Sequence, residues 1–424
     1  MDTANVTIEL GYALDTFYFL ICGALVMWMA AGFAMLESGL VRSRNTAEIL
    51  TKNVALYSIA CVMYLLLGYQ IMYGGDGLNS VIPSLGALLP AENTAEAVLA
   101  GGDDAPYYSG ASDFFFQVVF VAATMSIISG AVAERMKLWS FLTFAVFMTA
   151  IIYPVQAYWS WGGGFLAGAG YSDFAGSGIV HLCGGIGALV GAIMVGPRLG
   201  KYDAEGRPRA IPGANLPLAT LGMFALWLGW FGFNGGSQLV LSSIDDANAV
   251  AKIFVNTNTA AAGGLLAALI TAKIKWGKAD LTMALNGALA GLVAITAEPL
   301  APSPLAATLI GAVGGIIVVF SVLALDRLRV DDPVGAISVH GTAGIWGVLI
   351  VPASNAGASI GPQLLGLVAI IGWTAAASAI VFGLIKLAMG LRVTEEEEYE
   401  GVDITECGLE AYPEFVGARG GTTG

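Results

Sequence analysis

Long apolar segments recur along the chain and constrain its fold more than any other feature. A helix rises 1.5 Å per residue, so about 20 mainly apolar residues span the hydrocarbon core of a bilayer. Eleven such segments lie near residues 13–36, 50–74, 113–134, 138–160, 176–196, 215–235, 250–273, 280–298, 304–325, 334–352 and 362–390. The sequence therefore predicts an all-α integral membrane protein with eleven transmembrane helices.

The composition supports a membrane protein and excludes one class of partner. Charged residues make up only 12% of the chain and mean hydropathy is +0.76, whereas soluble domains carry about 25% charged residues. The net charge of −13 leaves no surface that could neutralise a phosphate backbone, so we expect no nucleic-acid partner. The four cysteines form no CxxC pair, and we expect no disulfide framework, metal site or cofactor.

Basic residues mark alternate loops and predict the topology, because Lys and Arg remain in short cytoplasmic loops. They follow the odd-numbered segments: Arg42, Arg44 and Lys52; Arg135 and Lys137; Arg198, Lys201, Arg207 and Arg209; Lys273, Lys275 and Lys278; Arg327 and Arg329; Lys386 and Arg392. The other loops are acidic apart from Lys252, and carry Asp76, Glu92, Glu96, Asp103, Asp104, Asp245, Asp246 and Glu298. We therefore place the N-terminus outside and the C-terminus inside.

A duplicated unit surrounds the only two histidines of the chain, His181 and His340. The same offset pairs Asp173 with Asp332, Gly176 with Gly335, Val180 with Val339, Gly185 with Gly344 and Ile186 with Ile345. Since five crossings separate equivalent positions, the second copy enters the membrane from the opposite side, as an inverted repeat. The expected units are residues 1–196 and 215–352, joined by a cytoplasmic loop at 197–214 and followed by an eleventh helix at 362–390 and an acidic cytoplasmic tail at 391–424.

The paired histidines have two interpretations. An isolated buried histidine in a soluble core usually bridges neighbouring elements by hydrogen bonds. Ionisable groups inside a membrane are costly, however, and usually face a cavity or a pathway. Because His181 and His340 occupy equivalent positions, we expect them to meet near the midplane and line a narrow passage, where neutral imidazoles share a hydrogen bond.

Aromatic residues gather at the outer ends of three predicted helices. They include Phe116 and Phe120 near Gln117, Trp159 and Trp161, and the run from Trp230 to Ser237. One interpretation is an aromatic belt at the membrane interface, which we favour for Trp159, Trp227 and Trp230. The other is a cation site, in which aromatic faces and a hydroxyl group bind a small cation.

Four motifs resemble signatures of the Amt family of ammonium transporters. They are ISGAVAER at 128–135, DFAGSGIVHLCGGIGALVGA at 173–192, GWFGFNGGS at 229–237 and RVDDPVGAISVHGTAGIWG at 329–347. The likeness extends to GFAMLESGLVRSRN at 32–45 and to GLRVTEEEEYEG at 390–401, so it covers nearly the whole chain in order. It implies an eleven-helix fold with inverted halves, assembled as a homotrimer in the plasma membrane with one pore per subunit.

The resemblance also implies roles for individual residues. Phe120 and Phe233 would be the stacked rings that close the mouth of the pore. Trp161, Ser237 and Phe120 would form an external recruitment site for ammonium, and Asp173 would hold that site through hydrogen bonds at a helix start. His181 and His340 would be the twin histidines that line the pore.

These roles combine into one expected mechanism without a catalytic residue, so the protein is not expected to be an enzyme. Ammonium would bind at the outer site, lose its proton and cross as ammonia, with the proton carried separately so that transport is electrogenic. The family resemblance further implies that the acidic tail packs on the cytoplasmic face and couples subunits or accepts a PII-type regulatory protein. A solvated, mobile tail is the alternative.

Alternatives from other classes stay open. His181 and His340 would suit the two axial ligands of a haem in a membrane cytochrome. A sensor would bind ammonium without moving it. A copper site at His181 and Cys183 is disfavoured, because side chains two residues apart diverge by about 200° on a helix.

Overall fold

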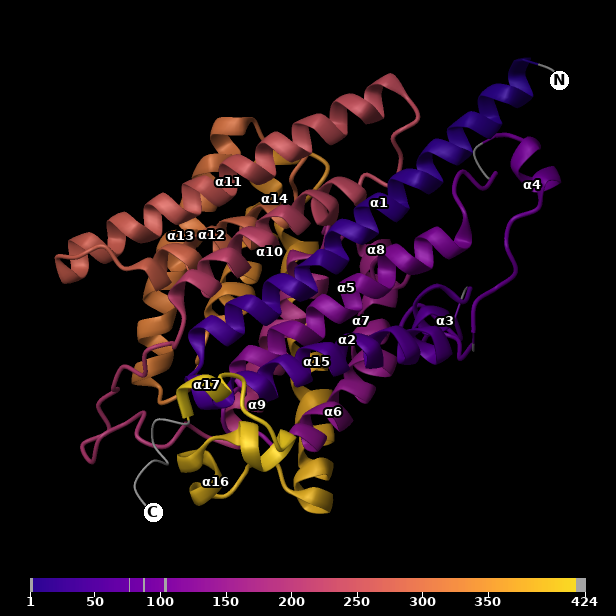
Figure 1. The fold of residues 1–424 in the computed structure, drawn as a ribbon. Coiled ribbons are helices and arrows are strands. Elements are labelled where there is room, and N and C mark those ends of the chain that lie inside the picture. The colour runs from indigo at the N-terminus through magenta and orange to yellow at the C-terminus, as the bar shows by residue number, and fades with distance from the viewer. Residues whose placement is uncertain (1–2, 76, 87, 103–104, 417–424) are drawn as a thin grey trace.

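The computed structural model describes residues 3–75, 77–86, 88–102 and 105–416 as a bundle of long helices (Figure 1). Throughout these ranges the regular elements are helical, and pairing between extended segments is limited to two isolated bridges. The expected all-α class is therefore confirmed. Three acidic loop residues used in the topology prediction, Asp76, Asp103 and Asp104, lie outside the described residues, as does the part of the predicted tail at 417–424.

Each of the eleven predicted segments coincides with a helix or a run of helices. In chain order these are α1 (Thr3–Leu40); η1, α2, η2 and α3 (Ser43–Asn45, Thr46–Met63, Tyr64–Gly68 and Tyr69–Tyr73); α5 (Gly110–Ala131); α6, η3 and α7 (Leu138–Phe147, Met148–Ile152 and Tyr153–Tyr158); η4 and α9 (Ser177–Leu182 and Cys183–Val195); α10 (Leu216–Gly236); α11 (Ile244–Trp276); α12 (Leu281–Thr296); α13 (Pro304–Arg327); η5 and α14 (Ile337–Thr342 and Ala343–Ser354); and α15 (Ile360–Met389). Short helices α4 (Ala95–Leu99) and α8 (Phe165–Ala169) lie between them, and α16 (Glu395–Glu400), η6 (Asp403–Cys407) and α17 (Pro413–Val416) follow.

Ten of these helical runs, within the described ranges, are long and apolar enough to cross a membrane. The eleventh, α12, is a shorter apolar helix of 16 residues. Residues Ala284–Thr296 of α12 are all buried, because α11, α13 and α14 pack around it. The chain is thus a multi-pass membrane protein, as its sequence predicts.

Capping residues determine where several of the helices begin. The side chains of Ser109, Asn215, Ser243, Asp280 and Ser303 each accept a hydrogen bond from the backbone N–H three residues further on. Such caps satisfy donors that the first helical turn leaves unpaired. Helix α1 begins at Thr3, ten residues before the predicted start, because a helix need not end where its apolar stretch ends.

Small residues allow the helices to approach closely. Helix α1 packs along α10, and a Cβ atom added at Gly222 would lie 2.3 Å from the backbone nitrogen of Leu36. Helices α11 and α13 meet in the same way, since a Cβ at Gly315 would lie 2.0 Å from the carbonyl oxygen of Gly264. In lipid, the hydrophobic effect does not drive helices together, because lipid tails are as apolar as the side chains. Close packing of the helix backbones stabilises their association instead.

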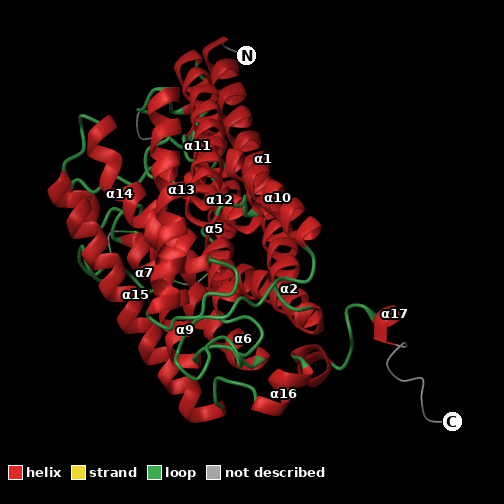
Figure 2. Cartoon of the chain, turned by 90° about the vertical axis from the view of Figure 1, so that its left-hand side faces the viewer, coloured by secondary structure: helices red, strands yellow, loops and turns green. Residues whose placement is uncertain are grey.

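The described part of the tail packs against the start of α2 and the loop after α9. The start of α1 and the tail helix α16 lie at opposite ends of the bundle (Figure 2). A carboxylate oxygen of Asp403 accepts a hydrogen bond of 2.8 Å from the backbone N–H of Glu48, and Glu398 accepts one of 2.7 Å from Leu199. The same Glu398 forms an ion pair of 2.6 Å with Arg392. We refer to the end of the bundle that holds α16 as the tail side.

A buried ionic cluster connects the segments that follow α5, α9 and α13 on the tail side. The Arg198 guanidinium forms two hydrogen bonds with the Asp331 carboxylate, of 2.8 and 3.0 Å. It also lies 3.6 Å from Glu134, and Arg135 donates to the Asp331 carbonyl oxygen at 2.9 Å. Burial opposes ionisation of Asp331, but the two guanidinium groups outweigh it and hold the pKa of this carboxyl well below its ordinary value.

Replacing Asp331 by Asn is expected to destabilise the protein strongly at neutral pH. A depressed carboxyl pKa contributes stability above the pKa of the unfolded chain, so at pH 7 this contribution is complete. The change breaks the hydrogen-bonded ion pair of the buried Arg198, which keeps only the more distant carboxylate of Glu134 at 3.6 Å. Breaking a buried pair costs about 3–5 kcal/mol. The melting temperature of the detergent-purified protein measures the effect. Glu205→Gln is the control, because Glu205 and its partner Arg207 are 64% and 73% exposed. Equal melting temperatures for the two variants would contradict a stabilising role for the ion pair between Asp331 and Arg198.

Candidate functional site

A cavity of about 420 Å³ opens at the end of the bundle opposite the tail. It brings together three of the predicted site residues, Phe120 from α5, Trp161 from the segment after α7, and Ser237 at the end of α10. The other residues that line it are Tyr69, Tyr73, Tyr108, Asp113, Phe116, Gln117, Phe174 and Leu239. We call this cavity the vestibule.

The polar groups of the vestibule are oriented by the backbone around them. The Trp161 indole N–H donates to the carbonyl oxygen of Asp173 at 3.0 Å. The Ser237 hydroxyl donates to the Phe233 carbonyl oxygen at 2.9 Å, which leaves the lone pairs of its oxygen available as acceptors. Asp113 adds a carboxylate that accepts from the Tyr69 hydroxyl at 2.6 Å. The vestibule thus combines acceptors, aromatic faces and negative charge, which suit a small cation.

Asp173 lies behind the vestibule and organises the start of η4. Its carboxylate accepts hydrogen bonds from the backbone N–H groups of Gly176, Gly178 and Ile179, at 2.9–3.1 Å. Burial raises the pKa of this carboxyl, while the backbone donors oppose the rise. Because its carbonyl oxygen also binds Trp161, Asp173 connects the helix start with the vestibule wall without lining the cavity itself.

Two stacked rings form the floor of the vestibule. The centroids of Phe120 and Phe233 are 4.0 Å apart with an interplanar angle of 26°, and both side chains are buried. Trp161 meets the Phe120 ring edge-on at 6.2 Å. The stacked pair separates the vestibule from the histidines below it.

The two histidines are in direct contact beneath the stacked rings. Their Nδ1 atoms lie 3.1 Å apart, and both side chains are buried. A single proton lies between these two nitrogens when both rings are neutral, so one Nδ1 donates and the other accepts. The remaining Nε2 atoms then differ: one carries a proton and the other a lone pair. The pair therefore offers a donor and an acceptor within one narrow passage.

Equivalent backbone distortions in the two repeats place these histidines. Each histidine lies in a short π-helical segment, His181 in η4 and His340 in η5. Each segment follows a glycine with a left-handed backbone, at φ 106° for Gly176 and 83° for Gly335. The repeat mate of Asp173 acts in the same way, since the Asp332 carboxylate accepts from the N–H groups of residues 337 and 338 at 2.9 and 3.2 Å.

Aromatic rings continue from the vestibule past the histidines. His181 stacks between Phe233, at 5.2 Å, and His340, at 5.1 Å, and it also stacks on Trp230 at 4.9 Å. On the tail side the Phe33 ring lies 6.1 Å from that of His340. Phe33 and His340 line a small cavity of about 10 Å³, which we call the lower cavity. One line of rings thus joins the vestibule to the lower cavity.

The geometry does not fit the haem or copper alternatives. A metal ion between two imidazole nitrogens separates them by about 4 Å, because each bond is roughly 2 Å long, whereas the two Nδ1 atoms lie 3.1 Å apart. Cys183 faces away from the pair and accepts a weak hydrogen bond from Thr374 on α15. Over the described ranges no three His, Cys, Asp or Glu side chains cluster so as to hold a metal ion.

Two of the tryptophans expected in an interface belt are buried instead, and part of the vestibule was not predicted. Trp230 does not belong to an interface belt: its side chain is fully buried, and its N–H donates to the Thr296 hydroxyl at 2.8 Å. Trp159 is also buried. Asp113 and the vestibule tyrosines were not predicted. Asp113 lies one helical turn before Gln117 on the same face of α5, a spacing that could have pointed to it.

Comparisons with known proteins agree with this architecture. The sequence model of the Ammonium Transporter Family matches residues 17–412. The chain belongs to the ammonium transporter family. The ammonium transporter Amt2 of Archaeoglobus fulgidus is 38% identical to this family member over 95% of the present chain and 89% of its own length. A putative ammonium transporter of Synechocystis is 37% identical, over 96% of this chain and 91% of its own length. The resemblance inferred from the motifs is therefore confirmed.

Solved structures show the same fold as this member of the ammonium transporter family. A sensor Amt protein superposes with a TM-score of 0.85 at 32% sequence identity, covering 94% of this chain and 99% of the other. Mep2 of Candida albicans superposes with a TM-score of 0.81 at 25% sequence identity, and the match covers 92% of this chain and 88% of Mep2. Both matches extend over nearly all of the helices described above.

Gly185→Ala is expected to disturb the histidine pair of this family member. The added Cβ atom would lie 2.4 Å from the backbone nitrogen of Gly341, next to His340, so η5 and α9 must move apart. Overpacking of this kind costs about 1–3 kcal/mol. Melting temperatures of the purified protein measure the loss. Gly372→Ala on α15, where the new methyl group meets open space, serves as the control. A Gly185→Ala protein that melts at the same temperature as the wild type would show that η5 and α9 can move apart without loss of stability.

Proposed function

We propose that this protein transports ammonium by binding the ion in the vestibule, removing its proton and conducting ammonia past His181 and His340. The observation that carries the proposal is the continuous line of rings from the vestibule to the contacting histidines. In this proposal the proton crosses separately, so that transport moves charge. Membership of the ammonium transporter family supports the substrate.

The vestibule has the chemistry to recruit ammonium. The Phe120 and Trp161 rings offer π faces, which stabilise a desolvated cation by about 2 kcal/mol. The free lone pairs of the Ser237 oxygen accept an N–H group of the ion. Asp173 keeps Trp161 in place through its carbonyl oxygen, and the Asp113 carboxylate raises the local concentration of cations.

The buried passage favours the neutral species. Transferring a cation into a low-dielectric interior is costly, whereas ammonia donates and accepts hydrogen bonds without a net charge. The mixed donor and acceptor character of the histidine pair suits such a molecule. Phe120 and Phe233 close the passage to water until a ring rotates. Potassium has no proton to lose, so the same passage rejects it.

The predicted topology and assembly belong to this proposal. The N-terminus lies outside and the C-terminus inside, with residues 1–196 and 215–352 as inverted five-helix repeats in the plasma membrane. The equivalent capping of η4 and η5 by Asp173 and Asp332 supports the duplication. By family resemblance the chain forms a homotrimer, and the packed tail presents a surface for a PII-type regulatory protein.

A sensor is the second candidate function. One structural neighbour, at a TM-score of 0.85, is named a sensor Amt protein. A sensor would use the same vestibule to bind ammonium but would conduct none. The two functions differ in one measurable property, which is the charge moved when ammonium is added to proteoliposomes.

Substituting either histidine is expected to abolish selective transport. In solid-supported-membrane electrophysiology of proteoliposomes, the wild type should give ammonium currents and no comparable potassium current. His181→Ala and His340→Ala remove the hydrogen-bonding path for ammonia, so the current should vanish or lose its selectivity. Potassium currents as large as ammonium currents in the wild type would overturn the mechanism. Ammonium binding without any current would establish the sensor.

Ser237→Ala is expected to weaken recruitment while the passage itself is preserved. The vestibule loses one acceptor for the ion, and loss of such a hydrogen bond to a charged group costs about 1.5–3 kcal/mol. The ammonium concentration for half-maximal current should therefore rise about tenfold or more, with the maximal current retained. Ser242→Ala, outside the vestibule, is the matched control. A half-maximal concentration equal to that of the wild type would remove Ser237 from the recruitment site.

A further inference from the structure

The lower cavity beneath the histidines contains a carboxyl group that the transport mechanism above does not use. Glu37 lies on α1 one helical turn after Phe33, so the two side chains share one face of the helix. Both line the lower cavity together with His340. The Glu37 side chain is buried near the tail-side end of the membrane-spanning helix α1, where a charged group is costly.

The hydrogen bonds of Glu37 are concentrated on one of its two oxygens. Its Oε2 accepts from the Ser129 hydroxyl at 2.6 Å and from the Asn53 amide at 3.2 Å. Its Oε1 has no hydrogen-bond partner. A buried carboxyl oxygen without a partner is unfavourable unless it binds a proton or a water molecule. The lower cavity, at about 10 Å³, is close to the smallest volume that holds one water.

The charges around Glu37 do not balance. Lys52 is the one cation among the groups facing it, and it lies 3.7 Å from a second buried carboxylate, Glu48. The Lys52 ammonium also donates to the Ser129 carbonyl oxygen at 3.3 Å. On α12, Asn286 contributes an uncharged amide to the lower cavity. Two buried carboxyl groups therefore share one ammonium group.

Other charged groups on this side make contacts of their own. Glu134 binds Arg42 through hydrogen bonds to the Arg42 backbone and side chain, and it lies 3.6 Å from Arg198. Asp403 of the tail accepts from the backbone N–H of Glu48. Asp332 caps η5 and has one oxygen without a partner, but it does not line the lower cavity. Among the residues that line the lower cavity, Glu37 is therefore the carboxyl group that lies beside His340.

We propose that Glu37 is the proton acceptor on the tail side of the histidine pair. This inference rests on the proposed function, because it requires a proton that has been separated from ammonia. The Nε2–H bond of His340 breaks as an O–H bond forms at Oε1 of Glu37, directly or through one water in the lower cavity. The Nδ1 atom of His340 takes up a proton from the His181 side, and Glu37 then releases its own proton toward the tail.

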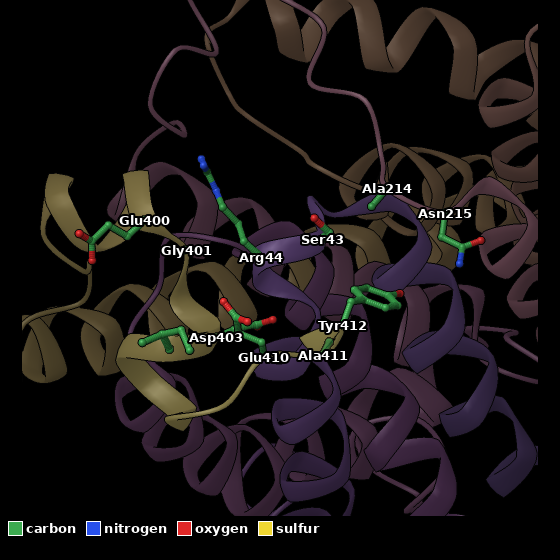
Figure 3. A pocket seen from close by; sticks show the side chains of 11 residues that line it. Ser43, Arg44, Ala214, Asn215, Glu400, Gly401, Asp403, Glu410, Ala411 and Tyr412 are labelled. Atoms are coloured by element: carbon green, nitrogen blue, oxygen red, sulfur yellow. The ribbon is translucent and has the colours of Figure 1, made fainter. Parts of the chain in front are cut away.

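A line of polar groups leads from Glu37 to the tail. Ser129 donates its hydroxyl to Glu37 and accepts from Lys52 at its carbonyl oxygen. Lys52 lies 3.7 Å from the Glu48 carboxylate, and the backbone N–H of Glu48 donates to Asp403. Asp403 lines a cavity of about 470 Å³ between the tail and the loop after α1. Figure 3 shows this cavity with Arg44 from that loop and with Asp403 and Glu410 from the tail. The released proton reaches bulk water there, away from the path of ammonia.

Two measurements on the full chain in proteoliposomes test this role. Solid-supported-membrane currents evoked by ammonium report the charge moved, and stopped-flow fluorescence of an enclosed pH dye reports the entry of ammonia. Glu37→Gln is expected to lower the current at least about tenfold, as loss of a proton-transfer group does, while ammonia entry persists. Glu37→Asp should restore part of the current with a displaced pH profile, which a merely structural role would not produce.

The control is a second buried carboxyl group on another helix end. Glu298 accepts hydrogen bonds from Ala301 and Asn355 and does not line the lower cavity, so Glu298→Gln should keep the wild-type current. An unchanged current and pH profile for Glu37→Gln would overturn the proposal.

Ser129→Ala provides a test that does not need the Glu37 variant to fold. Removing the hydroxyl donor disfavours the charged form of Glu37, so the pH at half-maximal current should rise. A profile that does not move would count against the role of Glu37. A wild-type protein that moves no charge would instead refute electrogenic transport itself, so the two failures are distinguishable.

Discussion

The contact between His181 and His340 is the constraint on which the remaining structure depends. Two imidazoles from separate repeats meet at 3.1 Å only if the backbones that carry them nearly touch. Residues without side chains make this possible, as at Gly185 against Gly341. The capped starts of η4 and η5, the rings stacked above the pair and the cavity below it are all arranged around this contact.

Much of the fold could be predicted from the sequence because lipid leaves few options for a chain. Apolar length determines the number of helices that can span a bilayer. The direction inferred from the loop charges stays a prediction. The repeat around the two histidines made their proximity predictable from an offset alone. The starts and ends of the helices were less predictable, since α1 and α11 continue beyond their apolar stretches as ordinary polar helix.

The site was only partly predictable because its members come from segments far apart in the chain. Asp113 and Tyr69 meet at the vestibule although they belong to different helices, and no local pattern signals that meeting. Trp230 near a helix end resembles an interface residue in sequence, but it is buried against His181. The π-helical turns that aim the histidines have no sequence signature as clear as a cap or a proline. Glu37 is likewise a single acidic residue near the end of an apolar run.

In the proposed mechanism, the stacked rings of Phe120 and Phe233 determine which part of the molecule must move during transport. Both lie on helices held by close backbone contacts, so the obstruction is removed by rotation about side-chain bonds rather than by displacement of a helix bundle. Side-chain rotations are intrinsically much faster than the microsecond-to-millisecond rearrangements of whole domains. The proposed mechanism therefore needs no alternation between outward-open and inward-open shapes, and a cross-link between the helices would leave conduction by this mechanism intact.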